Sequence, residues 1–166
     1  NGRSFPFIDA WKAINLSYVG HLILAAWGAF LWMRKPLGRA GAFLGAGVFA
    51  LSGFMAVHHI HLNLIQAGAW LPWVLWALDI LFLHGRFRAF LLAVGFMTLA
   101  AFAGHPQTVV QSGLVIGAYG LGRGLLTPSE SRTGSTFRGA LIAGAVVVAA
   151  AGLYLVHVLP GLELAS

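Results

Sequence analysis

Ala103-Gly104-His105-Pro106-Gln107 is a polar break between two apolar runs, and it decides how the rest of the chain is placed. Residues 89–102 before it carry no charge, and residues 108–121 after it are almost as apolar. A proline inside a helix removes a backbone hydrogen bond, and lipid offers no partner for the carbonyl group that is freed. We therefore expect a turn between two helices, located at a membrane surface or against buried polar groups.

The composition of the chain is that of an integral membrane protein. Charged residues make up 8% of the 166 residues and hydrophobic residues 59%, whereas soluble domains carry about a quarter charged residues. The apolar residues form long runs without the alternation of membrane barrels, which predicts an all-α, polytopic transmembrane helical bundle. The absence of cysteine excludes disulfides and thiolate metal sites.

The apolar runs predict one transmembrane region over residues 1–166 with about six spans. The polar segment 58–68 is expected to be re-entrant or interfacial, and 123–138 is expected to be a hydrophilic loop. The chain starts without methionine and stops just after an apolar run, so we expect it to be part of a longer protein. The predicted spans are 14–33, 41–57, 69–83, 89–103, 108–122 and 139–159.

The basic residues predict the orientation of these spans. Arg3 and Lys12 fall on one side of the alternating loops, and all other basic residues fall on the opposite side. The positive-inside rule makes the basic loops cytoplasmic and the turns rich in histidine and glutamine outward, in a bacterial inner membrane. The net charge of +6 is thereby explained without a nucleic-acid partner. The residues of the basic side are Arg34, Lys35, Arg39, Arg86, Arg88, Arg123, Arg132 and Arg138.

Polar side chains gather on the outward side and predict a cavity that opens outward and binds a polar substrate. The candidate binding residues are His58, His61, His105, Gln107 and Glu163. For any one of them the simpler interpretation is a side chain that solvates a helix end. Their occurrence in three separate clusters favours the cavity.

Other interpretations of the polar residues stay open. His58 and His61 are three apart and, with His105 or Glu163, would form a divalent-metal site, although no acidic pair accompanies them. Haem or pigment ligation by His21 or His157 is an alternative to simple packing. Asp79, the only acid inside a span, is expected to reach the cytoplasmic interface. Trp70, Trp73 and Trp76 predict an aromatic belt.

Three stretches together resemble the bacterial YfhO family of polytopic membrane proteins. The resemblance implies a GT-C-type glycosyltransferase, which takes a sugar from a polyprenyl-phosphate donor on the outer membrane face. His105, Gln107 and Glu163 match the motifs and would bind or orient a sugar or phosphate group. The catalytic acid of such enzymes lies in a first outer loop. Asp9 matches no motif there, so the catalytic residue is unknown. The stretches are Leu51-Ser52-Gly53-Phe54 with His58 and Ala69-Trp70-Leu71-Pro72-Trp73; Ala103-Gly104-His105-Pro106-Gln107-Thr108; and Leu159-Pro160-Gly161-Leu162-Glu163-Leu164-Ala165-Ser166.

The leading hypothesis is therefore the membrane scaffold and outer-face substrate cavity of a GT-C-like glycosyltransferase. Its partners would be membrane lipid and a polyprenyl-linked sugar donor. The rival hypothesis is a non-catalytic transmembrane subunit of a larger membrane complex, with packed histidines or a histidine-ligated haem or pigment. A transporter is a weaker third hypothesis, because the spans carry few charges at depth.

Overall fold

The computed structural model describes residues 10–58, 60–126 and 132–163, with side chains over 11–58, 60–126 and 135–156. Over these ranges the chain forms helices and no strands, which confirms the all-α prediction. The helices are α1 (Ala10–Ala50), α2 (Gly53–Val57), α3 (Leu62–Ala69), α4 (Leu71–His84), α5 (Phe87–Phe102), α6 (Pro106–Leu126) and α7 (Arg132–Glu163).

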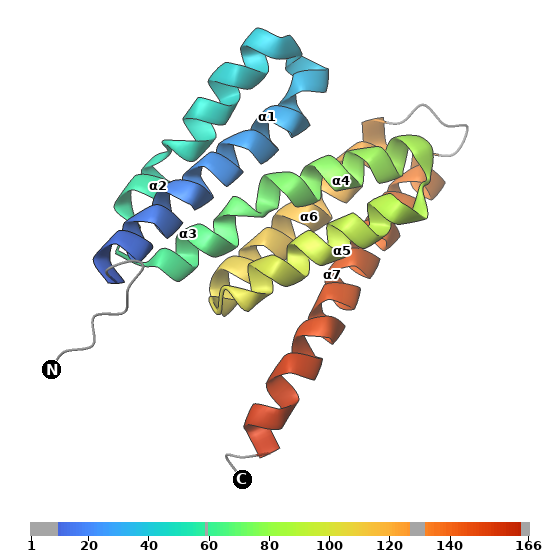
Figure 1. Ribbon diagram of the computed structural model, residues 1–166. Coiled ribbons are helices and arrows are strands. Elements are labelled where there is room, and N and C mark those ends of the chain that lie inside the picture. The colour runs from blue at the N-terminus through green and yellow to red at the C-terminus, as the bar shows by residue number, and fades with distance from the viewer. Residues whose placement is uncertain (1–9, 59, 127–131, 164–166) are drawn as a thin grey trace, which may run out of the picture.

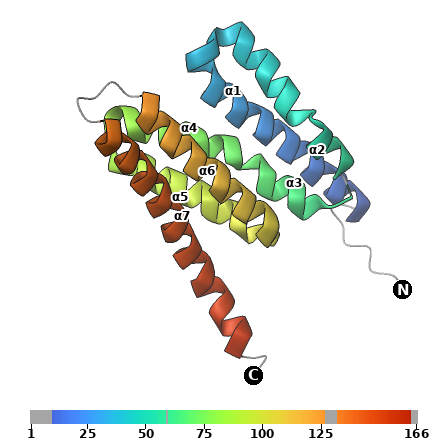
Figure 2. The ribbon, with the colours of Figure 1, turned by 180° about the vertical axis from the view of Figure 1, so that it is seen from behind.

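Helix α1 is a hairpin of two antiparallel arms (Figures 1 and 2). Gly38 has φ 70° and ψ −179°, a left-handed conformation that glycine adopts without a steric penalty. The chain therefore folds back within the basic segment 34–39, where the sequence predicts a turn between two spans. Ala42, Ala46 and Ala50 are buried at helical spacing along the second arm. Small side chains in such a row let neighbouring helices approach closely.

The segment expected to be re-entrant or interfacial is helical from Leu62 onward. Helices α3 and α4 form one largely apolar run of 23 residues, Leu62–His84, interrupted by a turn at Trp70. The span thus begins earlier than the predicted residue 69. The reason is that the histidines precede the helix while small and apolar residues fill its buried side. Those buried residues are Ile65, Ala67, Gly68 and Ala69.

Four helical segments of the described residues are long and apolar enough to cross a membrane: Trp11–Val57, which is folded at Gly38, Leu62–His84, Pro106–Leu126 and Ser135–Val156. At about 1.5 Å per residue, a helix of some 20 residues crosses the roughly 30 Å hydrocarbon core. Large apolar side chains cover the outside: Phe43 and Val48 are each 74% exposed and Leu114 is 70% exposed. This apolar surface fits a protein embedded in lipid.

The core is built from α4, α5, α6 and α7. Leu78, Ile116 and Val146, from α4, α6 and α7, are completely buried together. Helices α6 and α7 meet at glycines: a Cβ atom added to Gly120 would lie 2.6 Å from the carbonyl oxygen of Gly139. No larger residue fits at this crossing without moving a helix.

Helix α4 docks on α1 through Trp73 instead of presenting it to a membrane surface. The Trp73 Nε1–H donates to the carbonyl oxygen of Leu24 at 3.0 Å, and its indole covers Gly28. Trp70 stacks on Phe96 of α5, with ring centroids 5.8 Å apart. These two tryptophans therefore join helices, which differs from the aromatic belt expected from their spacing.

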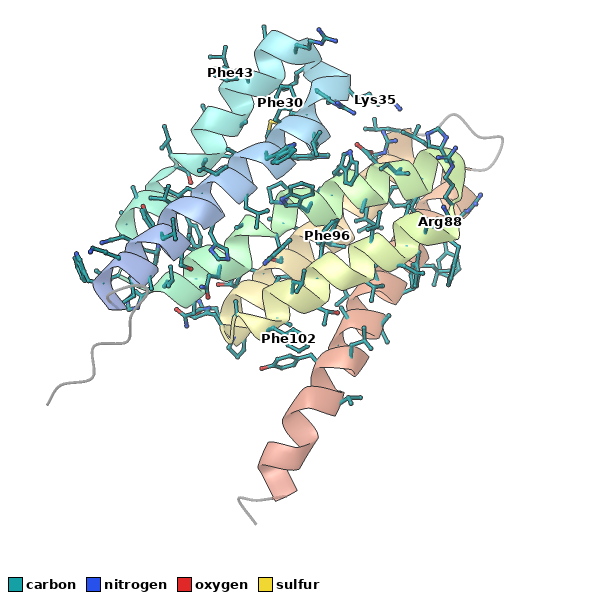
Figure 3. The ribbon with its side chains drawn as sticks, in the orientation of Figure 1. Phe30, Lys35, Phe43, Arg88, Phe96 and Phe102 are labelled. Atoms are coloured by element: carbon teal, nitrogen blue, oxygen red, sulfur yellow. The ribbon has the colours of Figure 1, made fainter. Side chains whose placement is uncertain are left out.

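The bundle has two chemically different ends (Figure 1). The polar end holds the start of α1, the α2–α3 connection and the α5–α6 turn. The basic end holds the bend of α1, the α4–α5 turn and the last turn of α6. Figure 3 places Lys35 and Arg88 at the basic end and Phe102 towards the polar end. The grouping of loops thus agrees with the alternation drawn from the sequence, while the side of the membrane that each end faces stays a prediction.

Candidate functional site

The stretch 103–107 forms a compact corner between α5 and α6. Gly104 has φ +75°, and its N–H donates to the carbonyl oxygen of Ala101 at 3.0 Å, which closes the end of α5. His105 then caps α6, because its Nδ1 accepts from the backbone N–H of Thr108 at 3.3 Å and lies 2.8 Å from the Thr108 hydroxyl. Pro106 starts the helix, where a missing N–H costs nothing.

This geometry fixes the tautomer of His105 and limits its role. Since Nδ1 accepts a backbone N–H, the ring proton of the neutral side chain is carried by Nε2. Nε2–H is then the group that His105 can present to a ligand. The ring is half-buried, and Gln107 is exposed on the first turn of α6.

The two other described candidates lie at the α2–α3 connection. The Nδ1–H of His58 donates to the carbonyl oxygen of Phe54 at 2.8 Å, and the two rings pack 4.7 Å apart. His61 is exposed before α3, with its ring centroid 6.4 Å from that of His58. Both histidines therefore lie at the polar end. Glu163 ends α7, and its side chain and that of His157 lie outside the described side chains.

A cavity of about 260 Å³ lies among α1, α2, α3, α4 and α6, and it carries polar groups that no single motif indicates. Its polar lining consists of Ser52, Thr108, Gln111 and Ser112. Apolar residues, among them Phe54 and Leu71, form the remaining wall. Small-molecule sites typically measure about 300–1,000 Å³, so this cavity suits one small group with a few convergent hydrogen bonds.

Two of the predicted site residues, His58 and His105, contact the wall of this cavity without lining it. His58 contacts Phe54 and His105 contacts Thr108, and both contacted residues form part of the wall. His61 and Gln107 are not among the lining residues. The structure thus brings the clusters at 58 and 105 to one cavity, with the histidines behind its wall and hydroxyl and amide groups on its surface.

A second group of polar side chains links α1 and α3 by hydrogen bonds at the same end. The Nε2–H of Gln66 donates to the hydroxyl of Ser17 at 3.2 Å, and the Nδ1–H of His21 donates to the Ser17 carbonyl oxygen at 2.7 Å. His21, a candidate haem or pigment ligand, is thus half-buried and hydrogen-bonded within its own helix. This contact would leave Nε2 as its ligating atom.

The divalent-metal hypothesis gains no support from the described residues. Within them, no group of three or more histidine or acidic side chains is close enough together to hold a metal ion. His58 and His61 remain a pair, since a third ligand does not join them in that part of the chain. Three protein ligands are the usual minimum for a zinc site.

The basic end contains a polar network that the sequence analysis did not predict. The Tyr119 hydroxyl donates to Asp79 Oδ1 at 2.7 Å, and the Trp32 Nε1–H donates to the Tyr119 hydroxyl at 3.2 Å. Arg123 Nε lies 3.3 Å from Asp79 Oδ1. Only 15% of the Asp79 side chain is exposed, so the carboxylate is held inside the bundle, whereas the sequence predicted that it would reach the cytoplasmic interface.

Sequence signals for the missed residues do exist. Thr108, Gln111, Ser112 and Val115 follow the i, i+3, i+4, i+7 spacing of one helical face, and all four line the cavity. Asp79 and Arg123 are charges predicted near the same membrane face, on different spans. That combination is the usual signal of an ion pair between transmembrane helices.

Comparisons with known proteins found no match: no family model, curated protein or solved structure matches the chain.

Proposed function

We propose that the chain forms the membrane scaffold and outer-face substrate cavity of a GT-C-like glycosyltransferase that uses a polyprenyl-phosphate-linked sugar. One observation carries the proposal. Ser52, Phe54, Leu71 and Thr108 come from the first two stretches that resemble the YfhO family, and all four line the same cavity. The two stretches are far apart in the sequence, resemble one family and contribute residues to one cavity. A shared role in binding a ligand explains this combination best.

The chemistry of the lining suits such a donor. Hydroxyl and amide groups both donate and accept hydrogen bonds, as a sugar requires, and none of them carries a charge. The apolar wall suits the isoprenoid chain that carries the sugar. In the proposal, the Nε2–H of His105 and the amide of Gln107 contact the head group at the rim. The catalytic base would come from a segment beyond those described here.

The proposal is tested by transfer of a labelled sugar from a polyprenyl-phosphate donor, measured with the full-length protein. Gln111→Leu keeps the side-chain volume but removes the amide, and Ser112→Leu fills the cavity; both are expected to lower transfer at least tenfold. Ala118→Leu adds the same side chain on the exposed surface of α6 and should leave transfer unchanged. Equal transfer in Gln111→Leu, Ser112→Leu and the wild type would remove the cavity from the mechanism.

A second candidate function is a transmembrane subunit of a larger complex. It is favoured by the C-terminal half of α7, which departs from the other helices (Figure 1). Leu153, Leu155 and Val156 are each more than half exposed there. A helix from another subunit would cover this surface. Co-purification of a stoichiometric membrane partner, or a visible absorption band from a histidine-ligated pigment, would favour this function over sugar transfer.

A further inference from the structure

A larger cavity lies at the basic end, away from the proposed sugar site. It measures about 560 Å³, is open on one side and is lined by the bend of α1, the end of α4 and the end of α6. Trp32 and Tyr119 of the polar network form part of its wall. The cavity therefore combines the hydrogen-bonded polar network with open space, at the end of the bundle opposite His58, His61 and His105.

The charges around this cavity favour an anion. Lys35 and Arg123 both line it, and among the residues that the structure describes Asp79 is the only acid that does. Asp79 is already engaged by Arg123 and by the Tyr119 hydroxyl, so it offsets one positive charge and leaves that of Lys35. Arg34 and Arg39 are exposed on the same bend and add to the positive potential at the rim.

The position and walls of the cavity match the boundary between hydrocarbon and headgroups. Leu37 lies at the bend of α1, Leu83 one residue before the end of α4, and Leu126 is the last residue of α6. Leu37 is 58% exposed and Leu126 is 79% exposed, so the apolar wall continues onto the outer surface. A lipid seated here would keep its chains in the bilayer while its phosphate entered the cavity.

We propose that this cavity binds the headgroup of an anionic phospholipid, with the phosphodiester beside Lys35 and Arg123. Basic pockets between transmembrane helices on the cytoplasmic side recognise anionic headgroups in this way. Trp32 has the amphipathic ring that suits this depth, and it is held by its hydrogen bond to Tyr119. The inference does not depend on the sugar-transfer proposal, since it uses neither the polar end nor its residues.

The test is lipid binding to the purified full-length protein, measured by native mass spectrometry. Phosphatidylglycerol and phosphatidylcholine with identical acyl chains are titrated separately, and inorganic phosphate is added as a competitor. The wild type is expected to retain one phosphatidylglycerol molecule at concentrations where phosphatidylcholine is lost. Millimolar phosphate should not displace it, because the acyl chains contribute to binding.

Matched variants locate the binding in this cavity. Lys35→Gln should weaken phosphatidylglycerol binding about fivefold, and Lys35→Arg should restore it. Arg88→Gln removes the same charge at the same end of the bundle, on α5, which does not line the cavity (Figure 3). It should leave the tight site intact. Lys35 is exposed, so its variants are expected to fold. Equal retention of both lipids, equal effects of Lys35→Gln and Arg88→Gln, or displacement by phosphate would each overturn the inference.

Discussion

The crossing of α6 and α7 at Gly120 allows one prediction to be worked out in detail. A methyl group at this position would place its carbon 2.6 Å from the Gly139 carbonyl oxygen and 2.7 Å from the Ala143 Cβ, whereas ordinary contacts begin at 3.4 Å. The helices would therefore have to separate by about 0.8 Å along a tightly packed interface. Overpacking of this kind typically costs about 1–3 kcal/mol.

Gly117 provides the matched control on the same helix. A Cβ atom added there has no atom of another helix within 4 Å, so Gly117→Ala adds the same methyl group without a clash. We expect Gly120→Ala to lower the free energy of unfolding by about 1–3 kcal/mol and Gly117→Ala to leave it unchanged or slightly raised. The assay is SDS-induced unfolding in mixed micelles, followed by circular dichroism. Equal unfolding midpoints for Gly120→Ala and Gly117→Ala would refute the close packing of α6 on α7.

Three further predictions use the same unfolding assay. Gly104→Ala should cost about 1–2 kcal/mol, because alanine resists the left-handed conformation, while Gly95→Ala, in open space within α5, should not; similar costs would contradict the corner geometry. His105→Ala should cost about 0.5–2 kcal/mol through loss of the helix cap and His105→Asn much less; an Asn variant that is stable but inactive in transfer would assign the imidazole a direct role. The effects of Asp79→Asn and Arg123→Gln on the free energy of unfolding should be non-additive by about 0.5–3 kcal/mol in a double-mutant cycle. Strict additivity would exclude an ion pair between the two residues.

Much of the fold follows from the distribution of apolar residues. The turn at 34–39 and the corner at 103–107 were predictable because prolines, glycines and charges interrupt long apolar runs there. The start of the third span was not, because His58, His61 and Gln66 lower the mean hydropathy of a segment that is nonetheless helical from Leu62. His58 and Gln66 form side-chain hydrogen bonds in the folded chain, and the order of residues in the sequence does not reveal these bonds.

The candidate site was predictable only in part. The sequence predicted that His58 and His105 lie at one end of the bundle. It did not predict that both form hydrogen bonds with nearby backbone groups, or that Thr108, Gln111 and Ser112 line the cavity. Which side of a helix faces a cavity depends on how neighbouring helices pack. For the same reason, the ion pair between Asp79 and Arg123 could be recognised only once the packing of α4 against α6 was known.

The central claim, that the cavity at the polar end opens outward and receives the lipid-linked sugar, is tested by a single labelling experiment. The chain contains no cysteine, so Gln111→Cys introduces a single reactive thiol at the cavity wall and Arg39→Cys one at the basic end. A membrane-impermeant maleimide is applied to intact cells, with and without a soluble short-chain polyprenyl-phosphate sugar. We predict that Gln111→Cys is labelled from outside and protected by the sugar donor, whereas Arg39→Cys is labelled only after permeabilisation. Labelling of Gln111→Cys only after permeabilisation, or at a rate that the donor does not change, would contradict the claim.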